Sequence, residues 1–167
     1  YATYIGGSGN EQLTALAVDE GGNAYLTGQT PSANFPATAT SAQSTPGGAD
    51  DAYVVKLAAT GALTYATYLG GTLNETAVAL AVDGAGNAYV TGNTSSVSFP
   101  GTSTGAQSAF GGLGDGYAVK LAANGARIYA TYIGGTSVDT PRARARGRRE
   151  RERVHSGAHS LDGLSRN

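Results

Sequence analysis

Carboxylates are the residues best placed to do chemistry in this chain, because it has no cysteine and its two histidines both stand near the C-terminus. His155 and His159 have a spacing that metal sites use on helices, but they have no third ligand of fixed geometry. Residues 1–140 contain no histidine for proton transfer near neutral pH or for a hydrolytic triad. We therefore expect no catalytic residue, no bound cofactor and no metal site.

Two acidic turns recur along the chain, at residues 19–23 and 83–87. Each combines an acid that can accept backbone hydrogen bonds, a glycine free to take positive φ and an asparagine that tolerates it. Ca²⁺ also favours such oxygens, and Asp50, Asp51 and Asp115 could add more, but the spacing does not match an EF-hand loop. We favour turn stabilisation over calcium, and calcium binding stays an open alternative. The predicted structural turn residues are Asp19, Gly22, Asn23, Asp83, Gly86 and Asn87.

Glutamates follow two glycine pairs, as Glu11 after Gly6-Gly7 and as Glu75 after Gly70-Gly71. They are expected to cap a strand or face a partner, and no pair has an evident spacing for glycoside hydrolysis. The glycine pairs do not open a helix with phosphate-binding spacing, which argues against nucleotide binding.

The elements that position these residues repeat at a fixed interval. The stretch Tyr-Ala-Thr-Tyr-(Ile/Leu)-Gly-Gly occurs at residues 1–7, 65–71 and 129–135, which are 64 residues apart. A period of this size is typical of repeat architectures, whose units bury their apolar faces against one another.

Each interval reads as four strands. Alternating small and branched residues at 15–19 and 79–83 predict strands. The acidic turns then close hairpins onto 23–28 and 87–92. Long connections at 29–50 and 93–114 follow, with Phe35 and Phe99 as their expected anchors, and they are either functional or held by their own side chains. Third strands are predicted at 51–57 and 115–121, each joined through a glycine turn to the next Tyr-Ala-Thr-Tyr strand.

The predicted fold is all-β, with four strands and one long loop per unit, the plan of a β-propeller blade. We expect two complete blades, at residues 1–64 and 65–128, and the first strand of a third blade from residue 129, all within a repeat domain of residues 1–140. Open strand edges and an uncovered blade face predict that the chain is marginally stable, aggregates or completes a ring by self-association.

Several motifs in matching order resemble the bacterial SBBP-type β-propeller repeat, a relative of NHL repeats. They are the Thr-Tyr-Leu-Gly-Gly at 67–71, the Ala-Val-Asp-x-x-Gly-Asn-Ala-Tyr-Val-Thr-Gly at 81–92, Phe99-Pro100 and the strand 115–121. The resemblance covers residues 1–140 and implies a propeller in a large secreted or surface-anchored bacterial protein. It implies no catalysis, and it supplies no active-site residue to carry over. Only two complete blades are present, whereas a closed ring needs at least four.

The C-terminal stretch has a different composition. Residues 1–140 hold three basic and nine acidic residues, a net charge of −6, whereas 141–167 hold eight arginines and three acids, a net charge of +5. A nucleic-acid-binding arm is disfavoured because the arginines have no interleaved aromatic residues, so we expect no nucleic-acid partner. A solvated, disordered terminus is one alternative. We favour the hypothesis that residues from about 146 onward are a frameshifted third blade, which the nucleotide sequence would test.

These patterns favour a non-enzymatic structural or binding module of a secreted or cell-surface bacterial protein, with a protein or glycan as partner. The alternative is a fragment of a propeller enzyme, such as a lyase or glycosidase, whose catalytic residues lie in other blades. The chain has no methionine, so we interpret it as a fragment or processed product. It also has no apolar run long enough to span a bilayer, so we expect no membrane insertion.

Overall fold

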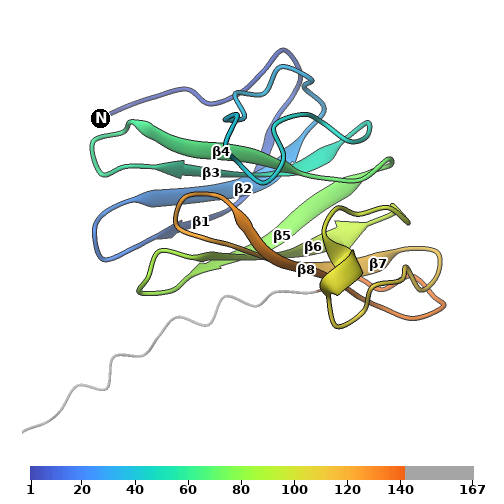
Figure 1. Cartoon of the computed structure of the whole chain (residues 1–167). Helices are drawn as coiled ribbons and strands as arrows, with labels where there is room; N and C mark the ends of the chain where they lie inside the picture. Colours follow the sequence, from blue (N-terminus) through green and yellow to red (C-terminus); the bar gives the residue numbers. More distant parts are fainter. Residues whose placement is uncertain (142–167) are drawn as a thin grey trace, which may run out of the picture.

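The computed structural model describes residues 1–141, which form two four-stranded antiparallel sheets stacked one on the other (Figure 1). In each sheet the strands follow one another in chain order. The all-β prediction and its two four-stranded units are therefore confirmed. The first sheet contains β1 (Gln12–Val18), β2 (Ala24–Thr30), β3 (Asp51–Leu57) and β4 (Leu63–Leu69). The second contains β5 (Glu75–Val82), β6 (Ala88–Thr94), β7 (Asp115–Leu121) and β8 (Arg127–Ile133), with a short 3₁₀ helix, η1 (Thr102–Thr104), before β7.

Tight turns with left-handed glycines close the hairpins. Between β1 and β2, Gly22 has φ 77°, and between β3 and β4, Gly61 has φ 86°. Their counterparts in the second sheet, Gly86 and Gly125, have φ 76° and 85°. Side chains with a Cβ are strained in this region, so glycine is the residue that allows these turns.

The third copy of the Tyr-Ala-Thr-Tyr stretch does not open a third blade. It lies in β8, where Tyr129 is paired with Lys120 and Ile133 with Gly116 of β7, so it completes the second sheet. The first copy, at residues 1–7, forms no strand, because no described strand lies beside it to pair with. A repeat defines a period but no starting point, and the hairpin connections now show that the unit begins at β1 and ends with the Tyr-Ala-Thr-Tyr strand.

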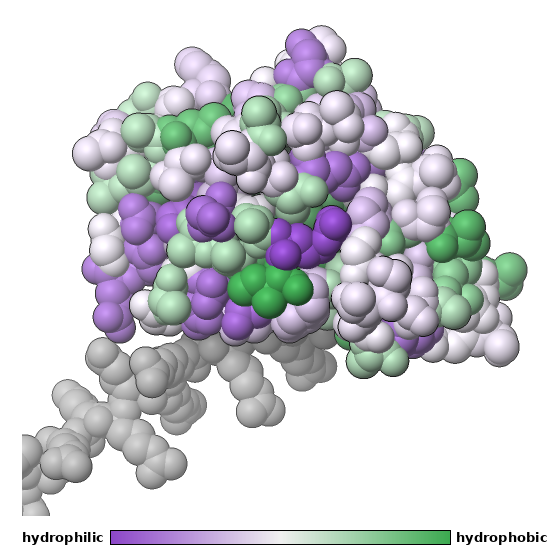
Figure 2. Space-filling view, in the orientation of Figure 1, coloured by the Kyte–Doolittle hydropathy of each residue, from purple (hydrophilic) through white to green (hydrophobic). Residues whose placement is uncertain are grey.

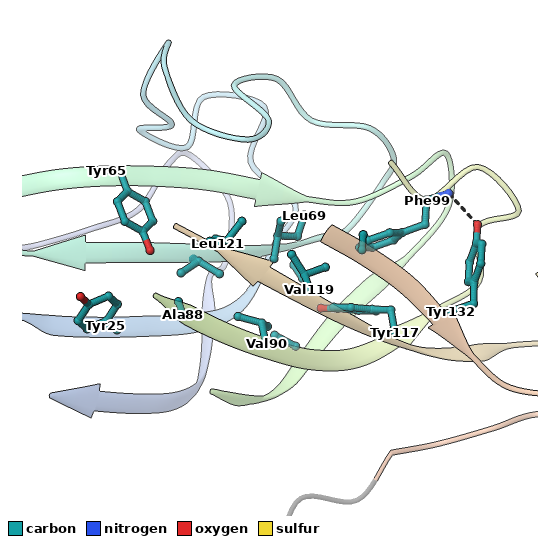
Figure 3. Packing of buried hydrophobic residues seen from close by; sticks show 14 residues of the cluster. Tyr25, Tyr65, Leu69, Ala88, Val90, Phe99, Tyr117, Val119, Leu121 and Tyr132 are labelled. Carbon is teal, nitrogen blue, oxygen red and sulfur yellow. Dashed lines mark hydrogen bonds between the residues drawn. The ribbon is translucent and has the colours of Figure 1, made fainter. Parts of the chain in front are cut away.

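Alternating side chains give each sheet two apolar faces, and one face of the first sheet packs on one face of the second (Figure 3). Tyr25, Tyr65 and Leu69 from the first sheet share a buried cluster with Val119 and Leu121 from the second. The opposite face of the first sheet carries a second cluster that includes Tyr68 and Val55. Tyr65 and Leu69 therefore lie on one face of the sheet and Tyr68 on the other, as the alternation of side chains along a strand requires.

The long loops cover the outer strands. In the first sheet, Tyr68 N donates to Gln43 O at 3.0 Å and Thr38 N donates to Ala66 O at 2.8 Å, so the loop pairs with the free edge of β4. Phe35 is buried against Tyr53, with ring centroids 4.7 Å apart. Phe99 is buried in the same way in the second sheet, which confirms both predicted anchors. The length of these loops therefore has a structural reason, because they cover an edge that could otherwise pair with another strand.

None of the helical structure within residues 1–141 is long and apolar enough to cross a membrane.

Gly92 in β6 lies close to the backbone of the neighbouring strand β5, and a substitution there tests this packing. A Cβ at Gly92 would collide with the carbonyl oxygen of Thr76 on β5, where backbone cannot move without breaking the ladder. We expect Gly92→Ala to lower the free energy of unfolding by about 2 kcal/mol. Gly84→Ala is the matched control, because a Cβ there meets nothing within 4 Å. Urea unfolding followed by circular dichroism measures both, and equal stability of the two variants would contradict this packing.

Candidate binding surface

An acidic side chain ties each glycine-pair turn to the sheet that follows it. Glu75 is buried, and its Oε2 accepts a hydrogen bond from Gly71 N at 2.7 Å. Its Oε1 accepts one from the Thr94 hydroxyl at 2.5 Å. Ser96 Oγ then accepts a hydrogen bond from Leu73 N at 2.8 Å, which fixes the middle of the turn. The carboxylate of Glu75 thus serves as an internal cap, one of the two roles predicted for it.

The same cap recurs at the other two glycine pairs. Glu11 Oε2 accepts from Gly7 N at 3.1 Å, and its Oε1 accepts from the hydroxyls of Thr30 and Ser32. In the third copy Asp139 accepts from Gly135 N at 2.6 Å. The backbone after β8 therefore follows the course that leads from β4 into β5.

A second buried acid stands at the start of each third strand. Asp51 accepts hydrogen bonds from Gly47 N at 2.7 Å and Gly48 N at 3.2 Å. Burial raises the pKa of Asp51 to about 6, and the negative charge of Glu75 adds to the shift. A carboxyl with a raised pKa is one feature of catalytic acids. Asp51 is nevertheless only 1% exposed, so its carboxylate holds the loop that returns to β3 and does not face solvent.

Asp115 occupies the equivalent position in the second sheet. Its Oδ2 accepts from Gly111 N at 2.8 Å and from Gln107 Nε2 at 3.3 Å. Its Oδ1 is buried with no hydrogen-bond partner among the described residues.

The acidic turns stand at the opposite ends of the strands from these caps. Asp83 Oδ1 accepts from Asn87 N at 2.9 Å, and its Oδ2 accepts from Asn87 Nδ2 at 2.8 Å and from the Tyr89 hydroxyl at 3.0 Å. The Asn87 side chain, followed by its backbone amide, lowers the pKa of Asp83 to about 2. Asp19 and Asn23 form the same bonds in the first sheet. Among residues 1–141, no three acids converge in a way that could hold a metal ion.

Two glutamines absent from the sequence predictions shape the exposed parts of the long loops. Gln43 Oε1 accepts from Gly70 N at 3.1 Å, while its Nε2 donates to Thr45 O at 3.0 Å. Gln107 forms the same two contacts, with Gly134 N and Ala109 O, each at 3.1 Å. Their recurrence 64 residues apart was a signal in the sequence that could have identified them.

These glutamines present two loop tips to solvent. The first tip is residues 44–46, Ser-Thr-Pro, which are exposed. The second is residues 108–110, Ser-Ala-Phe, of which Ser108 and Ala109 are exposed. Serine and threonine hydroxyls both donate and accept hydrogen bonds, so the first tip can contact polar ligands.

Two grooves lie on the faces that the sheet contact leaves open. One, of about 840 Å³, lies over Tyr89, Thr91 and Tyr129 and reaches the inner strands β1 and β5. The other, of about 470 Å³, lies between the N-terminal segment and Tyr53, Val55 and other residues of the first sheet. In Figure 2, hydrophobic and hydrophilic residues are interspersed over the visible side of the molecule.

A sequence profile described as a β-propeller repeat, SBBP, matches residues 1–36 and 64–100. These two segments are thus the parts of the chain that match an SBBP β-propeller repeat. In both matches the SBBP profile runs from the Tyr-Ala-Thr-Tyr stretch through the acidic turn to the phenylalanine anchor of the long loop. No curated protein matches the chain.

The SBBP repeat pattern therefore spans the joint between consecutive sheets. The second match begins at the second residue of β4 and contains the Glu75 cap, β5, β6 and Phe99. The strand β7 and the loop tip at 108–110 lie outside it. The matched segment thus contains the connection from one sheet to the next and the anchor of the loop.

The stability that the Asp83 turn contributes should depend on pH. Because the folded pKa of Asp83 lies near 2, below its ordinary value of 3.8, its stabilising effect is complete above pH 3.8 and is lost as the pH falls toward 2. Asp83→Ala should lower the melting temperature at pH 7 by a few degrees, and this difference from the wild type should shrink between pH 4 and pH 2. Thermal unfolding followed by circular dichroism across this range measures it.

The exposed Glu20, in the equivalent turn of the first sheet, provides the control. Glu20→Ala should leave the melting temperature near the wild-type value at pH 7. A deficit in Asp83→Ala that stays constant down to pH 2 would show that the carboxylate charge is not the stabilising feature.

Proposed function

We propose that the two SBBP repeats form a non-enzymatic structural or binding module of a secreted or cell-surface bacterial protein, with a protein or a glycan as its partner. The observation that carries this proposal is the use of the carboxylates. Glu11, Glu75, Asp51, Asp115 and Asp139 each accept hydrogen bonds from backbone amides of the turns and loops beside them. Carboxylates committed to backbone amides are structural supports.

The loop tips are the surface proposed to contact the partner. They are held by the rigid sheets through Gln43 and Gln107, yet their own side chains face solvent. Binding residues are often found on loops that a rigid scaffold positions. The two tips also differ in sequence, Ser-Thr-Pro against Ser-Ala-Phe, whereas their supports are the same in both repeats.

Binding to bacterial cell envelopes tests the proposed partner class. The full chain should sediment with isolated envelopes, and a double Ser44→Ala, Thr45→Ala variant should lose about tenfold in affinity, because two hydroxyl contacts are removed. Thr60→Ala is the matched control, since Thr60 is an exposed threonine in the β3–β4 turn. Protease treatment of the envelopes abolishes binding to a protein partner, and periodate oxidation abolishes binding to a glycan. Absence of sedimentation, or equal binding by all three chains, would overturn this surface.

A turnover screen tests the non-enzymatic part of the proposal. The full chain is expected to release no product from chromogenic glycosides or from polyuronate polysaccharides, the substrates of glycosidases and lyases. Turnover that Asp51→Asn abolishes would reject the proposal, because the raised pKa of Asp51 would then belong to a catalytic acid. Circular dichroism of the variant shows whether it retains the fold.

A further inference from the structure

The contact between the two sheets defines two kinds of face. We use face A for the side of a sheet that carries the tyrosine of β2 or β6 and the lysine of β3 or β7, and face B for the opposite side. In the structure, face A of the first sheet packs on face B of the second. Across this contact Tyr25 Oη lies 3.1 Å from Gly86 O, and Lys56 Nζ donates to Ala123 O at 3.2 Å.

The two faces that remain open carry nearly the same residues as the two that are packed. At six positions compared on face A, four residues are identical between the sheets. They are Tyr25, Thr27, Val54, Lys56, Tyr65 and Leu69 in the first sheet, and Tyr89, Thr91, Ala118, Lys120, Tyr129 and Ile133 in the second. At eight positions compared on face B, seven residues are identical. They are Ala24, Leu26, Phe35, Tyr53, Val55, Leu57, Ala66 and Tyr68 in the first sheet, and Ala88, Val90, Phe99, Tyr117, Val119, Leu121, Ala130 and Tyr132 in the second.

Equivalent residues differ in solvent exposure between the packed faces and the open faces. Tyr65 and Leu69 are each 1% exposed in the sheet contact, whereas their counterparts Tyr129 and Ile133 are 38% and 54% exposed. On the open face B, Val18 is 59% exposed, whereas its counterpart Val82 packs against the core. On the open face B the exposed apolar residues lie on β1, where Leu13, Leu16 and Val18 are 55–59% exposed, whereas Tyr53, Val55 and Tyr68 are at most 5% exposed. Exposed apolar surface of this kind marks an interaction site.

Face A of the second sheet already has the geometry of the packed one. Lys120 Nζ lies 4.9 Å from the centroid of the Tyr89 ring, and Lys56 Nζ lies the same 4.9 Å from the Tyr25 ring. The lysine and tyrosine would therefore need no rearrangement to dock on a face B.

The N-terminal segment partly occupies the open face B. A side chain at Gly61 would meet the ring of Tyr1, just as one at Gly125 would meet the ring of Tyr65. Ile5 packs against the cluster on face B of the first sheet. Residues 1–7 thus lie where the fourth strand of a preceding sheet would lie, although they form no strand themselves.

We propose that face A of the second sheet binds face B of the first sheet in a second copy of this chain, and that residues 1–7 compete with this contact. The repeat predicts its register, because each atom pair of the internal contact shifts by 64 residues. Tyr89 Oη would meet Gly22 O of the second copy, and Lys120 Nζ would meet its Ala59 O. This inference is independent of the ligand proposed for the loop tips.

Such a contact is heterologous, since it joins two different surfaces, and it continues into rings or open chains of copies. It differs from the isologous pairing of two like faces in one testable respect. Each copy keeps one free face A and one free face B, so variants blocked on opposite faces can still pair with each other.

Two exposed positions allow this complementation test with the full chain. Tyr129→Asp blocks face A of the second sheet, and Val18→Asp blocks face B of the first. Sedimentation velocity over increasing concentration should show oligomers for the wild type and, for either variant alone, an association constant lowered about tenfold or more. An equimolar mixture of the two variants should recover association but stop at dimers. Association that the mixture fails to recover, or that neither variant weakens, would overturn the proposal.

Cross-linking between single cysteines tests the predicted register. It does not depend on the folding of the two aspartate variants. The chain has no cysteine, so Lys120→Cys and Ala59→Cys each carry a single thiol. A short bis-maleimide should join Lys120→Cys to Ala59→Cys in a mixture far more than it joins either variant to itself. Leu113→Cys, at the opposite end of β7, is the control and should not join to Ala59→Cys. Preferred linkage of Lys120→Cys to itself would establish an isologous contact and reject the proposal.

A substitution in residues 1–7 should raise the association constant, whereas the two face variants should lower it. Ile5→Asp should release residues 1–7 from face B and so raise the association constant above that of the wild type by about tenfold. Monomers at every concentration for both the wild type and Ile5→Asp would show that the two open faces do not bind each other.

Discussion

The packing of one sheet on the next is the interaction on which the rest of this structure depends. A four-stranded sheet has two apolar faces and no helix to cover them, so each sheet must bury its faces against a neighbour. Tyrosines contribute much of the contact area, because each ring buries roughly 150–250 Å². Their hydroxyls impose a second requirement, which Tyr117 meets through Thr76 O at 3.3 Å. Tyr65 has no partner for its hydroxyl among the described residues, an unfavourable contribution that the apolar contact must outweigh.

The inner strands show how this packing shapes the backbone. Both β1 and β5 have a register shift in the middle, between Leu13 and Ala15 and between Ala77 and Ala79. Such bulges bend a strand and turn its side chains in new directions. In β1 the residue at the bulge is Thr14, whose hydroxyl donates to Ala77 O on β5 at 2.8 Å. The irregularity thus supplies a polar bond between sheets at the place where their inner strands come together.

Much of this fold could be predicted from the sequence, because a 64-residue period and alternation along strands are local signals. The period predicted the four-stranded units, and Phe35 and Phe99 were predicted as the anchors of the two long loops. The phase of the repeat was not predicted, because sequence identity between copies is the same wherever the unit is taken to begin. The pairing of β8 with β7, as in Tyr129 with Lys120, shows that the third copy ends a sheet. The frameshift hypothesis and the two histidines concern residues outside those that the structure describes.

The candidate surface was harder to predict, because its supports are polar residues far apart in sequence. The bond from Gly70 N to Gln43 Oε1 joins a loop to a turn 27 residues later, and no local pattern encodes such a pair. The turn residues Asp19 and Asp83 were accessible to prediction since their partners lie four residues away.

The long loops divide into a part that the fold constrains and a part that it leaves free. Residues such as Phe35 and Gln43 bind the outer strand, and their counterparts Phe99 and Gln107 do the same, so a change there would expose the edge of β4 or β8. At the tips this constraint ends, because the glutamine holds the backbone carbonyl of the tip and not its side chains. The two repeats differ at the tips and agree at the supports. Variation confined to exposed positions on a fixed support is what a binding surface requires, because the partner contacts can change while the sheet contact stays the same.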